Sequence, residues 1–330
     1  MDPFTHVLAG VVVGGLFEAD AAGYATAVAA AIAPDAEFVT RKIPRTAFLD
    51  YHHGLAHTIP GGAAAGLLIA ALAGAVTGRG WLPFLPLAMG GVASHVILDL
   101  LMHNNGIALF APFSRRRFSF PLVLGLNPVT ASPSCRDHRY STCIACQANG
   151  LRFNPFFWVL LAAAVASVAV PQLGSVWASL AIVVVLGISL RANQLRRTAL
   201  AVAGVSDKSW RRKAFPATHS GNQWLVLQED SKGIHAALID AAQRRSLWRR
   251  RIEYRPAPGP VESTESLLSV RGFKNSVLFP FWSHRREGGD NHVIWQDLSY
   301  LFSEDVELYA LHVRTDESGS VLHNEFNERW

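Results

Sequence analysis

The chain has 330 residues, of which 50% are hydrophobic and 17% charged, and its mean hydropathy is +0.20. Soluble domains have about a quarter of their residues charged, so this composition argues against an ordinary soluble protein and indicates a membrane protein with some soluble mass. The net charge of +5 fits loops beside anionic lipid better than a nucleic-acid site. With 3 cysteines, a disulfide framework is not expected.

The first two thirds of the chain contain the apolar segments. We predict about six apolar helices within a polytopic membrane domain of residues 1–200. Because a membrane span needs about 20 residues, the first two segments are short, whereas the third and fourth are long enough. A long polar loop, residues 103–154, separates the fourth segment from the last pair. The predicted helices cover residues 5–17, 22–33, 59–77, 81–102, 155–170 and 173–190.

Basic residues are distributed unevenly among the loops that join these segments. One set of loops carries Arg41, Lys42, Arg45, Arg115, Arg116, Arg117, Arg136, Arg139 and Arg152, and the tail after the last helix carries Arg191, Arg196, Arg197, Arg211, Arg212 and Lys213. The opposite set has only Arg79. Lysine and arginine accumulate in cytoplasmic loops, so we expect a multi-pass protein of a bacterial-type inner membrane with both termini in the cytoplasm.

Residues 205–330 are different in composition. Short β-type runs alternate with turns, and they cover residues 223–228, 234–239, 276–282, 292–295 and 306–314. Asp316 to Gly319 is typical of a hairpin turn before Val321. We expect a small, mainly antiparallel β domain on the cytoplasmic face. A basic cluster, Arg244, Arg245, Trp248, Arg249, Arg250 and Arg251, favours a solvated face beside anionic lipid headgroups, and nucleic acid is an unlikely partner.

Metal-ligand residue types gather at the ends of the first four apolar segments. Each place falls on the same predicted membrane face. His95 and Asp99 are four residues apart, so they lie on one face of a helix. His52 and His57 would converge only if Gly54 lets the chain turn. The candidates are His6, then Asp35 with Glu37, then His52, His53 and His57, and finally His95 and Asp99.

A carboxylate within an apolar span requires a partner. An ionisable group at that depth costs roughly 2.5–3.5 kcal/mol on insertion scales, so Asp99 indicates a compensating charge. Imidazole and carboxylate ligands suit a divalent transition metal, and we expect zinc, with one or two ions in the site. Each residue also has a simpler role: His6 at the membrane interface, Asp35 as a helix cap, and His95 with Asp99 as a hydrogen bond between helices.

Five short motifs occur in a fixed order within about the first 120 residues. The sequence contains Thr5-His6, Pro34-Asp35-Ala36-Glu37, His52-His53-Gly54-Leu55-Ala56-His57-Thr58, Ser94-His95-Val96-Ile97-Leu98-Asp99, and Gly106 followed by Leu109 to Ser114. This ordered set resembles the membrane-bound metal-dependent hydrolase family, the YbcI/YdjM-like group. In that family the corresponding motifs are T-H, P-D-x-D, H-R-G-x-T-H-S, S-H-x-x-L-D and a G…L-x-x-P-F-S stretch.

The resemblance implies a metal centre and hydrolase activity. Its ligands would be His6, Asp35, His52, His57, His95 and Asp99. This chain departs from the family motifs at four positions, where His53 replaces Arg, Ala56 replaces Thr, Thr58 replaces Ser and Glu37 replaces Asp. The loss of an arginine weakens the case for recognition of an anionic substrate more than the case for metal binding.

All 3 cysteines fall in the long polar loop. Cys135, His138, Cys143 and Cys146 have the donor types of a structural zinc site with three thiolates and one imidazole. The spacing is tight, so an iron–sulfur or redox role, and thiols without a metal, remain as alternatives.

The function predicted from these patterns is hydrolysis at the cytoplasmic membrane surface. A metal-activated water would attack an ester or phosphoester of a lipid or lipid-linked phosphate substrate, and Glu37 or His53 would act as the general base. Two other functions fit the pattern. One is a non-catalytic scaffold that has a structural metal and a partner-binding soluble domain. The other is a transporter, but its binding site would be expected near the membrane midplane.

Overall fold

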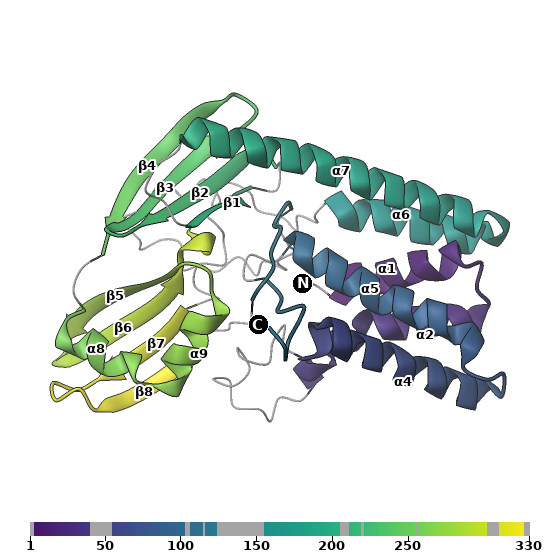
Figure 1. The fold of residues 1–330 in the computed structure, drawn as a ribbon, viewed down its shortest axis with the longest axis horizontal. Helices are drawn as coiled ribbons and strands as arrows, with labels where there is room; N and C mark the ends of the chain where they lie inside the picture. The colour runs from purple at the N-terminus through teal and green to yellow at the C-terminus, as the bar shows by residue number, and fades with distance from the viewer. Residues whose placement is uncertain are drawn as a thin grey trace. The chain divides into compact units, whose positions relative to one another are not determined.

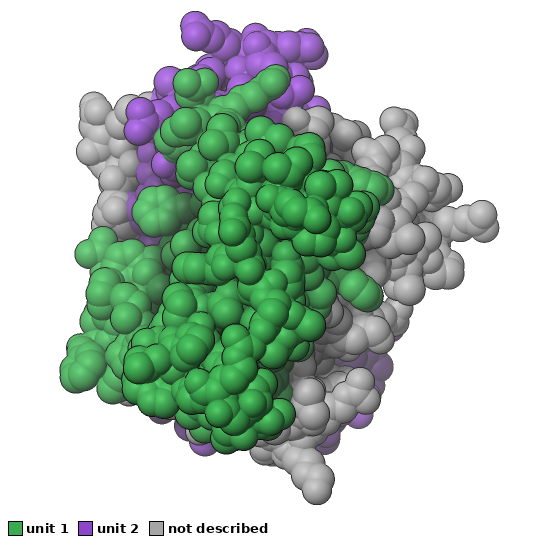
Figure 2. Space-filling view, turned by 90° about the vertical axis from the view of Figure 1, so that its right-hand side faces the viewer, with its two compact units in different colours: residues 1–42, 52–127, 152–194 green, residues 43–51, 128–151, 195–330 purple. Residues whose placement is uncertain are grey.

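The computed structural model describes residues 3–39, 55–102, 106–114, 116–123, 155–204, 211–218, 221–254, 257–301 and 310–326. The chain divides into two compact units, coloured separately in Figure 2. Unit 1 comprises residues 1–42, 52–127 and 152–194, and unit 2 comprises residues 43–51, 128–151 and 195–330. The sequence predicts a helical part followed by a β-rich part, and the described residues confirm this order.

Unit 1 is helical. Its helices are α1 (Pro3–Leu16), α2 (Ala21–Ile32), α4 (Ile59–Thr77), α5 (Leu85–Met102), α6 (Pro155–Ala169) and the first part of α7 (Gly174–Ala203). Short turns join α1 to α2 and α4 to α5, so each pair is an antiparallel hairpin. Helix α2 packs against α1, α4 and α5, and α6 packs against α1 (Figure 1).

Three stretches in the described part of the chain are long and apolar enough to cross a membrane. They are Ile59–Thr77, Leu82–Met102 and Pro171–Ala203. Helices α1, α2 and α6 are shorter, with 14, 12 and 15 residues. The prediction of about six membrane helices is therefore supported for three of them, and the short helices are apolar without reaching the length of a span.

The interface between α2 and its neighbours consists of small residues. Ala27, Ala30 and Ala88 are fully buried there. A β-carbon at Gly91 of α5 would lie 2.5 Å from the Ala27 carbonyl oxygen, and one at Gly10 of α1 would lie 2.6 Å from the Val28 α-carbon. The helix backbones approach this closely because neither position carries a side chain, as is typical of helices that pack in a membrane.

In the turn between α1 and α2, polar side chains make contacts with neighbouring helical segments. Asp20 caps α2 by accepting a hydrogen bond from Gly23 N at 2.9 Å, and its second oxygen pairs with Arg79 in the turn before α5. Glu18 accepts a hydrogen bond from Ser175 Oγ at the start of α7, at 2.8 Å. These contacts are exposed and contribute little to the free energy of unfolding individually, but they connect three helical segments.

Helix α7 continues well beyond residue 190, where the apolar segment was predicted to end. Residues 191–203 are rich in alanine, leucine and arginine, which are strong helix formers, so the helix does not need an apolar environment to continue. Its last residues belong to unit 2, where side chains satisfy the terminal carbonyl oxygens. Arg249 donates to Val202 O at 3.0 Å, and Gln228 donates to Gly204 O at 2.8 Å.

Unit 2 contains two antiparallel sheets, each with four strands in sequential order. The first sheet consists of β1 (Arg211–Pro216), β2 (Gln223–Asp230), β3 (Gly233–Asp240) and β4 (Arg245–Glu253). The second consists of β5 (Pro280–Glu287), β6 (Asp290–Asp297), β7 (Ala310–Thr315) and β8 (Val321–Phe326). Two short helices, α8 (Gly259–Glu265) and α9 (Leu268–Ser276), lie between the sheets in sequence and contribute apolar residues to the core of the second one.

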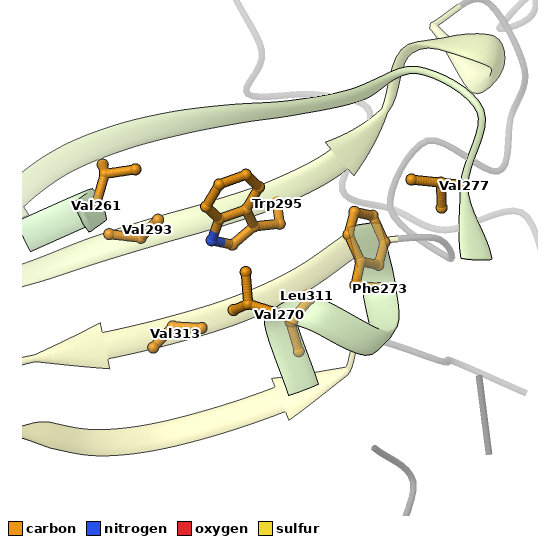
Figure 3. Packing of buried hydrophobic residues seen from close by; sticks show 8 residues of the cluster. All are labelled: Val261, Val270, Phe273, Val277, Val293, Trp295, Leu311 and Val313. Carbon is orange, nitrogen blue, oxygen red and sulfur yellow. The ribbon is translucent and has the colours of Figure 1, made fainter. Parts of the chain in front are cut away.

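That core surrounds Trp295 (Figure 3). Val293 and Trp295 of β6, with Leu311 and Val313 of β7, meet Val261, Val270 and Phe273 of the two helices, and all of these residues are buried. The indole nitrogen of Trp295 donates to Thr264 Oγ1 at 3.1 Å, so its polar group is also satisfied.

One feature of unit 2 differs from the sequence prediction, and a second was not predicted. The run 276–282 is not one strand, because α9 ends at Ser276 and β5 begins at Pro280. The basic cluster is mostly strand: β4 pairs only with β3 in the described residues and forms an edge of its sheet. Charged residues on an edge strand oppose pairing with a second chain, which explains how an arginine-rich segment can be a strand.

Replacing Trp295 by alanine should destabilise unit 2 by about 3–5 kcal/mol, because it leaves a cavity and removes the partner of Thr264. Chemical denaturation of the detergent-purified chain measures the change. The control is Leu322→Ala, which truncates a 49% exposed side chain on β8 and should change stability by less than about 0.5 kcal/mol. Equal losses in both variants would contradict the assigned core.

Alanine at Gly91 should destabilise unit 1 although alanine favours helices, because its β-carbon meets the backbone of α2; overpacking of this kind costs about 1–3 kcal/mol. The same substitution at Gly187 of α7 has no described atom within 4 Å and should stabilise the helix by about 0.5–1 kcal/mol. Melting temperatures of the two variants in detergent should therefore move in opposite directions. A shift in the same direction would show that α2 and α5 are not in close contact.

Candidate metal centre

His95 and Asp99 lie on one face of α5, near its C-terminal end. Both side chains are fully buried, and His95 Nε2 lies 3.3 Å from Asp99 Oδ2. The spacing of four residues places one above the other along the helix, as the sequence predicts. They face the short segments that follow α2 and precede α4.

Asp35 and His57 come from those two segments, which are 3-10 turns. Asp35 lies in Ala33–Val39, directly after α2, and His57 is the last residue of Leu55–His57. Helix α4 begins just after His57, because Thr58 caps it by accepting a hydrogen bond from Gly61 N at 3.0 Å and Pro60 occupies its first turn. The helix therefore starts where the histidine can point back towards α5.

The four side chains converge. One donor atom from each of Asp35, His57, His95 and Asp99 lies within 4.8 Å of the other three. His57 Nε2 is 3.4 Å from Asp35 Oδ1 and 3.3 Å from Asp99 Oδ2, and His95 Nε2 is 3.6 Å from Asp35 Oδ1. We call these four residues the quartet. All are fully buried except Asp35, whose side chain is 12% exposed.

A backbone contact fixes the orientation of the His95 ring. His95 Nδ1 lies 2.7 Å from the Ala31 carbonyl oxygen, and because a carbonyl only accepts, Nδ1 carries the proton. In the neutral ring, Nε2 is then left with its lone pair, 3.1 Å from His57 Nε2. Metal-binding histidines are usually held by a hydrogen bond of this kind from the distal nitrogen.

His6 of α1 lies beside the quartet. Its ring is fully buried and stacks on the His95 ring, with centroids 3.7 Å apart and an interplanar angle of 16°. Its Nε2 is 3.4 Å from Asp99 Oδ1 and 3.9 Å from Asp35 Oδ2. Apart from these two carboxylate contacts, neither ring nitrogen has a polar partner within the described residues.

The electrostatics of the site favour a positive charge at its centre. Burial lowers the pKa of His57, but the contacts with Asp35 and Asp99 raise it by more than burial lowers it. The result is a pKa of about 9. Burial raises the pKa of Asp35, whereas its hydrogen bond with His57 lowers it, and the pKa stays below its ordinary value. A proton on His57 partly balances two carboxylates, and a divalent cation would do so more completely.

The donor set fits a metal ion. Two imidazole nitrogens and two carboxylate oxygens suit zinc, manganese or iron. Buried polar atoms without a hydrogen bond in the described residues include His6 Nε2 and Asp35 Oδ1, and both lie within 4 Å of other donor atoms of the site. Polar atoms are rarely left unpaired in a protein interior, so the arrangement is compatible with a bound cation.

Several predicted site residues lie outside the described part of the chain. His52 and His53 are among them, as is the whole set Cys135, His138, Cys143 and Cys146. The backbone of Glu37 belongs to the 3-10 turn after α2, but its side chain is not described. The roles assigned to these residues remain predictions.

Two contributors to the site were missed from the sequence. The Ala31 carbonyl is a backbone group, so no residue type marks it. Gly91 precedes His95 by one helical turn and allows the approach to α2 that brings Ala31 within reach. The Gly90-Gly91 pair was a visible signal, because consecutive glycines within an apolar helix indicate close packing.

Searches of curated proteins and of solved structures find no protein that matches this chain. A family model matches residues 1–195, a range that includes His6 and the whole quartet. That family is described as the YdjM inner membrane protein, in agreement with the resemblance inferred from the motifs. Because the match covers 195 of 330 residues, the chain belongs to the YdjM inner membrane protein family.

Proposed function

We propose that this chain is a membrane-bound hydrolase that depends on a divalent metal held by the quartet. The observation that carries the proposal is the convergence of Asp35, His57, His95 and Asp99, three of them fully buried, from separate segments onto one point. Burial of two carboxylates costs several kcal/mol per charge unless they are compensated, so a cluster like this is expected to have a function.

The residues have separate tasks in this proposal. His57 and His95 would donate nitrogen ligands, and the hydrogen bond from His95 to Ala31 holds the second ring in place. Asp35 and Asp99 would supply oxygen ligands and negative charge. When bound, a divalent cation polarises a phosphoryl or carbonyl oxygen and lowers the pKa of a water molecule. Glu37 or His53 would take the proton from that water.

The position of the quartet supports a lipid or lipid-linked phosphate as the substrate. His57 directly precedes the span Ile59–Thr77, and Asp99 lies in the last turn of Leu82–Met102. Substrate groups at the headgroup level would therefore be nearest to the site. In this proposal the site faces the cytoplasm, the side on which arginine-rich loops are expected.

Metal content is the first test. Elemental analysis of the detergent-purified chain should find at least one divalent ion per molecule. Asp99→Asn keeps the shape of the side chain but removes the charge, and it should reduce bound metal by about 10-fold or more. The matched control is Asp20→Asn at the opposite end of α2, where asparagine caps a helix equally well and metal content should not change. A wild-type protein without metal would overturn the proposal.

Hydrolysis is the second test, with bis(p-nitrophenyl) phosphate and phosphatidic acid in mixed micelles as probes. Removal of the metal by a chelator, or the Asp99→Asn change, should reduce the rate by on the order of 100-fold, because transition-state charge loses its stabilisation. Asp20→Asn should retain the wild-type rate. Protein that keeps its metal but hydrolyses neither probe nor a wider ester panel would favour the scaffold function with a structural metal.

A further inference from the structure

We propose that the centre holds two divalent cations bridged by Asp35 and Asp99, with His6 as a ligand of the second ion. This inference rests on the proposed function and specifies its metal count and substrate class. Among the described histidines, His57 and His95 would bind the first ion. His6 would bind the second.

Each of the two carboxylates has one oxygen nearest to His57 and His95 and the other nearest to His6. Asp35 directs Oδ1 towards His57 and His95, at 3.4 and 3.6 Å, while Oδ2 is the oxygen 3.9 Å from His6 Nε2. Asp99 has the same division: Oδ2 lies 3.3 Å from both His57 and His95, and Oδ1 lies 3.4 Å from His6. A carboxylate that binds one ion does not require this division, whereas a bridging carboxylate places one oxygen on each ion.

The stacking of His6 on His95 gives the spacing that two ions require. The rings are nearly parallel, with centroids 3.7 Å apart, and each directs Nε2 towards the same pair of carboxylates. Ions in two-metal hydrolytic sites lie about 3.5–4 Å apart. The separation of the ring centroids falls in the same range and is compatible with one ion on each imidazole.

A purely structural histidine in this place would be expected to have a hydrogen-bond partner. His95 has one in the Ala31 carbonyl, whereas His6 Nδ1 has none within the described residues and His6 Nε2 faces only the two carboxylates, at 3.4 and 3.9 Å. A buried polar group left unpaired costs about 1–3 kcal/mol. A cation on His6 Nε2 would also compensate the charge of the two carboxylates that face this nitrogen, which packing against His95 does not.

The division of ligands indicates where a substrate binds. The first ion has four protein ligands from the quartet, while the second has three: His6, Asp35 and Asp99. A catalytic ion characteristically keeps an open position beside three protein ligands. Two divalent cations with two carboxylates and three neutral imidazoles carry a net charge of +2. An anionic phosphoester fits that charge better than a neutral carboxylic ester.

The test reconstitutes the full-length, detergent-purified chain with Mn²⁺ alone and measures ions per molecule and the electron paramagnetic resonance spectrum. The wild type should hold about two ions and give the spectrum of an exchange-coupled pair. His6→Phe keeps a ring against His95 but removes the nitrogen, and it should hold about one ion with an uncoupled six-line spectrum. His235→Phe on β3, a half-exposed position that contacts Asp230, is the matched control and should behave as the wild type.

Three other outcomes would overturn the two-ion centre. One uncoupled ion in both the wild type and His6→Phe overturns the two-ion centre and leaves the proposed function in place. Loss of all metal in His6→Phe also overturns it, because His6 would then belong to a single-ion site. A wild type without metal overturns both proposals. If His6→Phe fails to fold, the wild-type ion count and spectrum still decide between one ion and two.

Discussion

The close approach of α5 to α2 is the constraint on which the site depends. Gly91 lets the two backbones come together, and one turn later His95 reaches the Ala31 carbonyl oxygen at 2.7 Å. Asp35 follows Ala31 by four residues, just beyond the end of α2. Helix α2 therefore orients one member of the quartet and is followed directly by another, so a change in the α2–α5 distance would alter both together.

The site also explains why this bundle is made of small residues. Buried carboxylates and imidazoles must be held at short distances, and large side chains between the helices would separate them. Ala27, Ala30 and Ala88 are fully buried, and glycine occurs at the closest approaches. Small residues bury little apolar area, so van der Waals contact between backbones replaces the usual large side chains as the source of stability.

The helices and the residues of the quartet could be predicted from the sequence because their signals are local. His95 and Asp99 follow the helical period, and the span 59–77 coincides with α4. Other features depend on contacts that no local pattern records. The Ala31 carbonyl has no side-chain signal, β4 is a strand because β3 provides its partner, and the end of α7 is stabilised by Arg249 and Gln228 from distant strands.

Asp99 links the packing of the helices to the site most directly. An aspartate in an apolar helix weakens membrane insertion, so the helix tolerates it only where other groups offset its charge. The histidines that can do so come from α1 and from the turn before α4, while Asp35 after α2 adds a second negative charge that also needs compensation, and all of these groups meet only when both hairpins have formed. A metal ion that binds all of them would therefore stabilise the packed arrangement of the hairpins as well as the site, because its ligands come together only in the folded bundle.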